Sequence, residues 1–245
     1  MADPQPVLAR RLLAEAVGTA LLVTVVVGSG IAAQRLSPSD VGLQLLENSI
    51  ATALGLAVLI LLFGPVSGGH FNPAVSAIDW LLGRRAGTGL RPIEVAAYSS
   101  AQVLGGVAGA VLANIMYALP AAQLSQRDRA TGPVLLAEVV ATAGLVALIF
   151  ALARTRRRGA LSAAAVGAYI GAAYWFASST SFANPAVTVG RAFSDTFAGI
   201  APASVPPFIL AQLVGAGVGA GLVLLLYPDA PAAADDALGP HNTPD

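Results

Sequence analysis

The chain has 245 residues, of which 56% are hydrophobic and 11% are charged, and its formal net charge at pH 7 is zero. Such a chain has too little polar surface to cover a soluble globule, so several of its helices must face lipid. The absence of cysteine excludes disulfides and thiol chemistry, and two histidines leave too few ligands for a metal site, so no metal or cofactor is expected. The balanced charge offers no basic patch for nucleic acid.

Residues 12 to 33 form the first predicted membrane span. Arg10 and Arg11 precede this apolar run of about twenty residues, which is too long for the apolar region of a signal peptide, so a retained helix is expected. The run contains one carboxylate, Glu15. A polar loop over residues 34 to 44 separates it from a second predicted span over residues 48 to 65.

Asn72-Pro73-Ala74 follows the second span and predicts a helix start, because Asn is a favoured N-cap and Pro is tolerated at the first helical position. The apolar run behind it ends at Leu82, so the helix is about 15 Å long, about half of a hydrocarbon core. Gly68 and Gly69 before it suit a chain that leaves one helix and re-enters the membrane. We therefore expect a half-helix that does not cross the bilayer.

A third span from Arg91-Pro92 to about Leu119 ends the first half, residues 120 to 133 form a loop, and the pattern then begins again. Four features return in the same order, which indicates a duplicated half-chain: Glu15 as Glu138, Asn72 as Asn184, Gln102 as Gln212 and Tyr117 as Tyr227. Three spans per half would invert the second half relative to the first. The predicted fold class is an all-α membrane protein with six transmembrane helices and two re-entrant half-helices in an inverted repeat.

The second half contains its own helix start at Asn184-Pro185-Ala186 and a last span over residues 206 to 227. Residues 1–228 are predicted to form a single transmembrane domain, with repeat one over about 12–119 and repeat two over about 133–227. Residues 229–245 are rich in Pro, Ala and Asp and are predicted to be a disordered cytoplasmic tail.

The arginines predict the orientation, because short cytoplasmic loops carry an excess of basic residues. One side of the predicted topology holds Arg10, Arg11, Arg84, Arg85, Arg91, Arg154, Arg156, Arg157 and Arg158, and the other side holds Arg35, Arg127, Arg129 and Arg191. Both termini are therefore expected in the cytoplasm, with the chain in the inner (plasma) membrane of the cell.

The paired half-helices suggest a conduction site near the bilayer midplane. If the side-chain oxygens of Asn72 and Asn184 cap the helices, their amide N–H groups can donate to a solute. Two helix N-termini also place positive partial charge there, which opposes cations and a protonated water chain. Small neutral hydroxylated solutes are the expected cargo. The alternative is that both asparagines serve only as caps.

From about residue 12 to residue 227 the chain resembles the aquaporins, or major intrinsic proteins. The resemblance rests on the run Ser67 to Val75, SGGHFNPAV, and on Asn184-Pro185-Ala186, together with Glu15, Glu138, Gln102 and Gln212 in family-like places. It implies a right-handed bundle in which the half-helices meet end to end. It also implies a homotetramer in a lipid bilayer, with a pore in each protomer.

The resemblance places a narrow filter at Thr52, Ala172, Ser181 and Val187. Family members usually have Arg at the position of Val187, and water-selective members have His at that of Ala172. Since both bulky polar groups are missing, we expect a wide, weakly polar constriction without a fixed charge. The assignments of Thr52 and Ala172 assume that no gap separates the filter from the motif.

Val187 also indicates which branch of the family the sequence resembles. With Ser181-Phe182-Ala183 before it and the run Arg191 to Phe197 after it, the sequence is similar to bacterial aquaglyceroporins found among arsenic-detoxification genes. This resemblance implies arsenous acid as a solute, beside glycerol and water. Arsenous acid is neutral and polyhydroxylated at pH 7, as glycerol is, and urea or methylated arsenicals fit the same reasoning.

Two carboxylates inside predicted spans, Glu15 and Glu138, occupy equivalent places in the repeats, so we interpret them, with Gln102 and Gln212, as structural anchors of the re-entrant loops rather than as proton relays. His70 resembles the family's His at the cytoplasmic pore mouth, where pore lining and loop packing both remain open.

Arg191 lies one helical turn beyond Val187. It either faces an outer vestibule of the pore, or pairs with Asp195 or extends to the interface. Tyr174, with its two aromatic neighbours in sequence, is interpreted as part of an interfacial aromatic belt.

The sequence therefore predicts a passive channel for small neutral solutes, of the aquaglyceroporin type. The alternatives are a water-selective aquaporin and a secondary transporter of small solutes. No acid–base or nucleophile constellation is present, so an enzyme is not expected.

Overall fold

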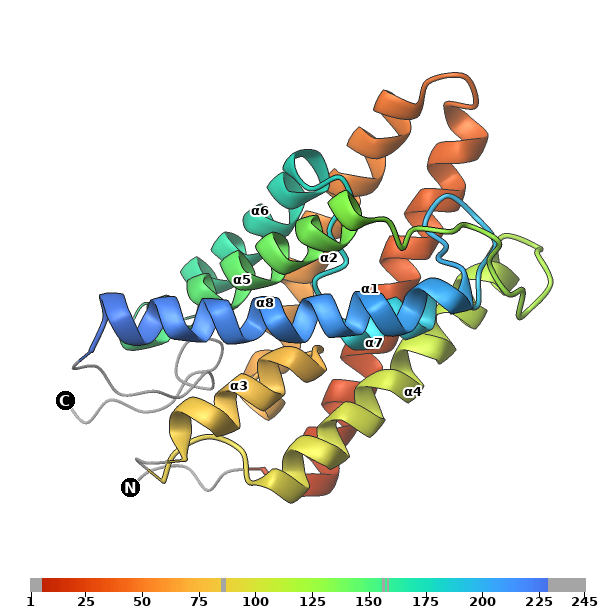
Figure 1. The fold of residues 1–245 in the computed structure, drawn as a ribbon. Helices are drawn as coiled ribbons and strands as arrows, with labels where there is room; N and C mark the ends of the chain where they lie inside the picture. The colour runs from red at the N-terminus through yellow and green to blue at the C-terminus, as the bar shows by residue number, and fades with distance from the viewer. Residues whose placement is uncertain (1–5, 85–86, 156, 158, 229–245) are drawn as a thin grey trace.

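The computed structural model describes residues 6–84, 87–155, 157 and 159–228 as a bundle of helices (Figure 1). The first half contains α1 (Leu8–Leu36), α2 (Val41–Ser67), α3 (Pro73–Gly83) and α4 (Pro92–Met116). The second half contains α5 (Gly132–Arg154), α6 (Ala160–Phe176), α7 (Pro185–Arg191), the 3-10 turn η1 (Pro202–Ser204) and α8 (Val205–Leu226). In each half, two membrane-spanning helices are thus followed by a short helix and then by a third spanning helix. The predicted disordered tail lies outside the described residues.

The helix lengths match six spans and two half-helices. Five helices in the described part of the chain are long and apolar enough to cross a membrane, namely α1, α2, α4, α5 and the last one with its leading turn. The sixth, α6, has 17 residues and is about 25 Å long, near the lower limit for a span. With 11 and 7 residues, α3 and α7 are too short. The predicted fold class is confirmed.

The connection between the first two spans is shorter than predicted. Residues 34 to 44 were expected to form a polar loop, but α1 continues to Leu36 and α2 begins at Val41. Asp40 explains the early start of α2, because its side chain accepts a hydrogen bond from the Leu43 N–H at 2.9 Å and so caps the helix.

Glycines bring the first and last long helix of each half into close contact. A Cβ atom on Gly105 or Gly109 of α4 would lie 2.2 or 2.1 Å from a backbone oxygen of α1. A Cβ atom on Gly215 of α8 would lie 2.4 Å from the Val139 oxygen of α5. Close helix approach through small residues is typical of membrane bundles. The short helices α3 and α7 contact each other inside the bundle, and α8 packs against both (Figure 1).

Gly109→Ala should therefore destabilise the bundle. The new methyl group would overlap the Ala20 carbonyl oxygen and push α1 away from α4. We expect a loss of about 2 kcal/mol, or a melting temperature lower by about 5 °C, measured on the detergent-solubilised protein. Gly221→Ala on α8 is the matched control, since a Cβ atom there meets nothing within 4 Å. An equal loss in both variants would contradict the packing argument.

Candidate functional site

The N-termini of α3 and α7 carry the two Asn-Pro-Ala sequences. Asn72 caps α3, where its Oδ1 accepts from the Ala74 N–H at 2.9 Å, and Pro73 follows as the first helical residue. In the same way Asn184 Oδ1 accepts from the Ala186 N–H at 2.9 Å, and Pro185 opens α7. Pro suits this position because it has no N–H that would need a partner.

The same asparagines also join the two halves of the chain. Asn72 Nδ2 donates to the Ala183 oxygen at 2.8 Å, and Asn184 Nδ2 donates to the Phe71 oxygen at 2.7 Å. A side-chain amide has two N–H groups, so each asparagine keeps a second one. Both residues line the cavity described below, which leaves these donors available to a solute.

The loops before the two asparagines share one backbone conformation. Positive φ angles occur at Gly68 (87°), Gly69 (61°) and Phe71 (49°), and at the corresponding positions of the second loop, Thr180 (63°), Ser181 (49°) and Ala183 (47°). Glycine adopts this region freely, but other residues lose about 1–2 kcal/mol each. The second loop therefore carries more backbone strain than the first.

Two buried carboxylates hold these loops. Glu15 accepts from the backbone N–H of His70 at 3.0 Å and of Phe71 at 2.7 Å, and from the Ser67 hydroxyl at 2.7 Å. Glu138 accepts from the backbone N–H of Phe182 and of Ala183, both at 2.9 Å. Charge-assisted hydrogen bonds of this kind are roughly twice as strong as neutral ones.

Each carboxylate is held by a glutamine, which also reaches the half-helix. Gln102 Nε2 donates to Glu15 at 2.7 Å and to the Ser76 hydroxyl at 3.1 Å. Gln212 Nε2 donates to Glu138 at 2.6 Å and to the Thr188 hydroxyl at 2.8 Å. The sequence argument missed the two hydroxyl residues, although their common spacing of four residues after each asparagine was a usable signal.

A cavity runs past both half-helix N-termini. Its polar lining consists of Thr52, His70, Asn72, Tyr174, Ser181, Asn184 and Arg191. The rest of its lining is Gly69 and the apolar residues Leu22, Val26, Leu56, Ile60, Phe71, Val75, Leu145, Ile149, Val166, Ile170, Phe182 and Val187. None of these described lining residues is acidic. Three of the four predicted filter positions, Thr52, Ser181 and Val187, thus lie along one cavity.

The fourth filter assignment, Ala172, is wrong. Ala172 is exposed on the outer side of α6, whereas Ile170 and Tyr174, four residues apart on the same helix, face the cavity. The Tyr174 hydroxyl lies 3.1 Å from that of Thr52, within hydrogen-bond distance. The interpretation of Tyr174 as part of an interfacial belt is therefore also wrong, because its side chain is buried.

Arg191 also lines the cavity, so the lining includes a cationic side chain beside the small residues of the expected constriction. Its guanidinium carbon lies 3.4 Å from the ring centroid of Phe182, and its Nε donates to the Ala198 oxygen. It does not pair with Asp195, whose Oδ1 instead accepts from the Gln126 N–H at 3.0 Å. The buried guanidinium of Arg191 thus lines the same cavity as the small filter residues Thr52, Ser181 and Val187.

The loop between α4 and α5 adds a second guanidinium beside the same ring. Arg129 donates to the oxygens of Gly199 at 2.7 Å and Phe197 at 3.1 Å, and its guanidinium carbon lies 5.4 Å from the Phe182 ring centroid. Burial lowers the pKa of Arg129 to about 10, which still leaves it charged at neutral pH. A hydrogen bond from the Ser204 hydroxyl lowers the pKa of the neighbouring Asp128.

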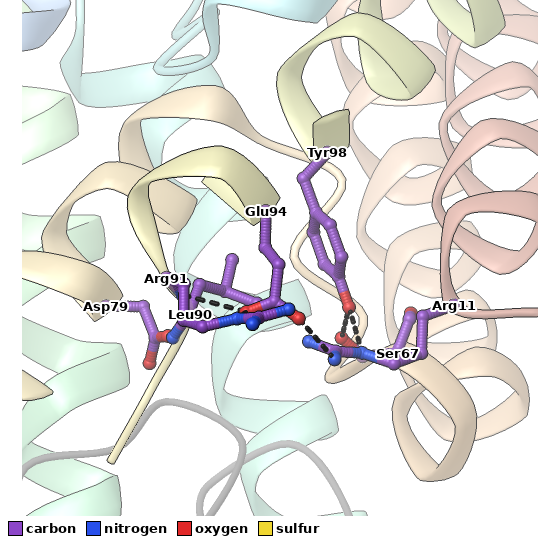
Figure 2. A network of polar contacts seen from close by, with 7 residues as sticks. All are labelled: Arg11, Ser67, Asp79, Leu90, Arg91, Glu94 and Tyr98. Atoms are coloured by element: carbon purple, nitrogen blue, oxygen red, sulfur yellow. Dashed lines mark hydrogen bonds and ion pairs between the residues drawn. The ribbon is translucent and has the colours of Figure 1, made fainter. Parts of the chain in front are cut away.

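His70 connects the opposite end of the cavity to a network of polar contacts. The His70 Nδ1 lies 3.0 Å from the Ser76 hydroxyl, and its ring lies 5.6 Å from that of Tyr98. The Tyr98 hydroxyl donates to the Ser67 oxygen at 2.9 Å and accepts from Arg11 Nε at 2.8 Å (Figure 2). These contacts tie the end of α2 to both α1 and α4.

The same network fixes the start of α4. Arg11 forms an ion pair with Glu94 at 3.1 Å, and the second oxygen of Glu94 accepts from the Arg91 backbone N–H at 2.9 Å (Figure 2). Nearby, Asp79 of α3 accepts from the Leu90 N–H at 2.7 Å. Leu90 and Arg91, at the end of the loop after α3, are thereby bound to α3 through Asp79 and to α4 through Glu94.

The sequence and the fold are similar to those of known membrane proteins. Residues 4–181 match the family described as "Major intrinsic protein". The chain is 49% identical over 226 residues to "Aquaglyceroporin AqpS" of Rhizobium meliloti (strain 1021), covering 91% of this chain and 93% of that protein. It is 32% identical to the "Glycerol uptake facilitator protein" of Pseudomonas aeruginosa, covering 96% of both. The solved aquaglyceroporin of Plasmodium falciparum has a similar fold, with a TM-score of 0.68 at 21% identity, covering 88% of this chain and 95% of that one.

Glu138→Gln should destabilise the second loop. The substitution removes the charge and turns one acceptor oxygen into an NH₂ group that faces a backbone N–H, so we expect a loss of about 3 kcal/mol and a lower yield of folded protein. Thermal melting in detergent measures the effect. Glu47→Gln is the control, because Glu47 accepts only from the Ser37 hydroxyl among the described residues. A melting temperature equal to that of this control would contradict the anchoring role.

Thr180→Gly should stabilise the same loop. Thr180 is a β-branched residue with a φ of 63°, and glycine adopts this angle without steric cost. We expect a gain of about 1 kcal/mol, seen as a melting temperature higher by about 2–4 °C. Ser178→Gly, outside the positive-φ positions, should give no gain. Equal changes in the two variants would show that strain at residue 180 is not what limits stability.

Proposed function

Because this chain belongs to the major intrinsic protein family, whose members are channels for small neutral solutes and not enzymes, we propose that solutes pass through the cavity between its two half-helices. The chain is a multi-pass membrane protein, and its flux is passive. The proposal concerns the path of the solute, the residues that line it and the solutes that it accepts.

The paired asparagine amides carry the proposal. Asn72 and Asn184 each use Oδ1 as a helix cap and one N–H to bind the loop of the other half. The remaining N–H groups offer donors to a solute oxygen in the middle of an otherwise apolar path. The helix N-termini add positive partial charge, which disfavours cations at this point. A neutral solute with several hydroxyl groups is the best match.

Other lining residues have roles along this path. Thr52, Ser181 and Val187 form the outer constriction together with Tyr174, which takes the place assigned to Ala172. His70 lies at the inner mouth, beyond Asn72. The anchors Glu15 and Glu138, with Gln102 and Gln212, are structural, because their polar atoms bind the loops and half-helices.

Glycerol, water and arsenous acid are the solutes that we propose. The names of the two curated relatives, an aquaglyceroporin and a glycerol uptake facilitator, support glycerol. Arsenous acid is a neutral molecule with three hydroxyl groups and fits the same donors. The arginine distribution supports an inner-membrane location with both termini in the cytoplasm, and family membership supports a homotetramer of single-domain protomers, each with two repeats.

A secondary transporter is the less favoured candidate. Coupling to an ion gradient usually needs an ionisable path within the membrane, and the described residues that line the cavity include no carboxylate. Proteoliposomes distinguish the two: stopped-flow light scattering with glycerol should show non-saturating flux that needs no ion gradient, and arsenous acid uptake should behave in the same way. Saturable flux that depends on a gradient would contradict the channel.

Asn184→Asp should impair the channel at its centre. A carboxylate replaces the amide donors and attracts cations, so we expect glycerol flux to fall by about tenfold, the equivalent of one neutral hydrogen bond, and proton leak to rise. Both are measured in proteoliposomes per folded protomer, and Asn72→Asp should give the same result.

Asn114→Asp is the matched control. Asn114 is a buried amide that donates to the Phe193 oxygen at 2.9 Å but does not line the cavity. It should lose stability without gaining a proton leak. Unchanged glycerol flux and unchanged leak in both central variants would exclude this path.

A further inference from the structure

The outer end of the cavity contains a guanidinium that comes from an unexpected position in the sequence. Val187 occupies the position directly after the second Asn-Pro-Ala, and Arg191 follows it by four residues at the end of α7. Residues four apart lie on the same face of a helix, about 6 Å apart along its axis. Both side chains line the same cavity, with Arg191 farther from Asn184.

The guanidinium of Arg191 is held in a fixed orientation. Its Nε donates to the Ala198 oxygen, and its plane packs against the Phe182 ring at 3.4 Å. The side chain is only 2% exposed. The ring contact and the Nε bond fix the guanidinium. Neither of them uses the N–H groups of the two Nη nitrogens.

The two Nη nitrogens have no hydrogen-bond partner among the described residues. Nε is the one guanidinium nitrogen with a hydrogen-bond partner among the described residues, yet neither Nη is among the buried atoms that lack a partner. Each Nη therefore keeps accessible surface, and the residue lines the cavity. Their four N–H donors lie in one plane and are not used by the described residues.

Among the residues that the structure describes, no carboxylate forms an ion pair with this guanidinium. Within the described part of the chain, neither Asp195 nor Glu138 lies in ion-pair distance of Arg191. Asp195 binds the Gln126 N–H, and Glu138 binds the loop before Asn184. Arg129, on the same Phe182 ring, adds positive charge instead of removing it.

We propose that Arg191, stacked on Phe182 and lining the same cavity as Tyr174, is the specificity-determining residue of the outer constriction, supplied from one helical turn beyond the position that Val187 occupies. This inference rests on the proposed function. The paired Nη donors select neutral solutes with two or more adjacent hydroxyl oxygens, of glycerol size, and the charge excludes cations. The other possibility is that Arg191 only anchors residues 192–199 through the Ala198 oxygen.

Arg191→Val tests the proposal in proteoliposomes, with glycerol flux, xylitol flux and proton leak measured per folded protomer. Removing the guanidinium should lower the ratio of glycerol to xylitol flux by about tenfold and raise the proton leak. The double variant Val187→Arg/Arg191→Val returns the charge to the constriction and should restore proton exclusion. A folded Arg191→Val protein with the ratio and the leak of the unaltered chain would overturn the proposal, as would a folded double variant that still leaks.

Arg127→Ala is the matched control. Arg127 stacks on Phe197 at 6.0 Å in the same outer region but does not line the cavity, so its removal should leave the flux ratio and the proton leak unchanged. If the control altered them as strongly as Arg191→Val, the effect would be one of general surface charge, and the proposal would fail.

Arg191→Lys decides the question if Arg191→Val does not fold. Lysine keeps the charge but lacks the planar pair of donors, so proton exclusion should persist while the glycerol to xylitol ratio falls. An unchanged ratio in the folded lysine variant would contradict the proposal. If the channel function itself were wrong, the unaltered chain would conduct neither glycerol nor water. That result differs from a chain that conducts both but does not depend on Arg191.

Discussion

The two halves of this channel are held together by an exchange of hydrogen bonds between two buried, non-helical loops. The residue before each asparagine is Phe71 or Ala183. Its N–H donates to the glutamate of its own half, and its oxygen accepts from the asparagine of the other half. Non-helical backbone at membrane depth is tolerated only where such partners exist. The positive φ angles of both residues orient these groups, so the loop strain, the carboxylates and the asparagines form one arrangement.

This arrangement decides what faces the solute. Because loop oxygens and amides gather at the half-helix N-termini, while α1, α2, α5 and α6 contribute aliphatic side chains, the cavity has polar groups set against an apolar wall. A solute that enters must replace its hydration shell by a few hydrogen-bond donors of the protein. Because these donors are few, the solute is not bound tightly, which suits conduction rather than tight binding. The two ends differ, since His70 lies toward one end and Arg191 toward the other.

The sequence allowed the central site and three of the four filter positions to be predicted, but not the fourth. Polar residues such as Glu15 and Gln102 stand out against apolar helices, and duplication doubles the signal. Ala172 was misplaced because the assignment was counted back from Asn184 across the loop over residues 177–184, where no helical period constrains which residue faces inward. Arg191 could not be resolved between vestibule and ion pair, because the choice depends on where the carboxylate of Asp195 finds its own partners.

The bond from Asn72 to Ala183 also bears on how the protein is made. The two residues are separated by 111 positions, so Asn72 emerges from the ribosome long before its partner exists. At 5–20 residues per second this interval lasts roughly 5 to 20 s. During that time the first half-helix has no second loop to bind, and its loop has only the partners of its own half, such as Glu15. The hydrogen bond from Asn72 to Ala183 can therefore form only after the second half of the chain has been synthesised.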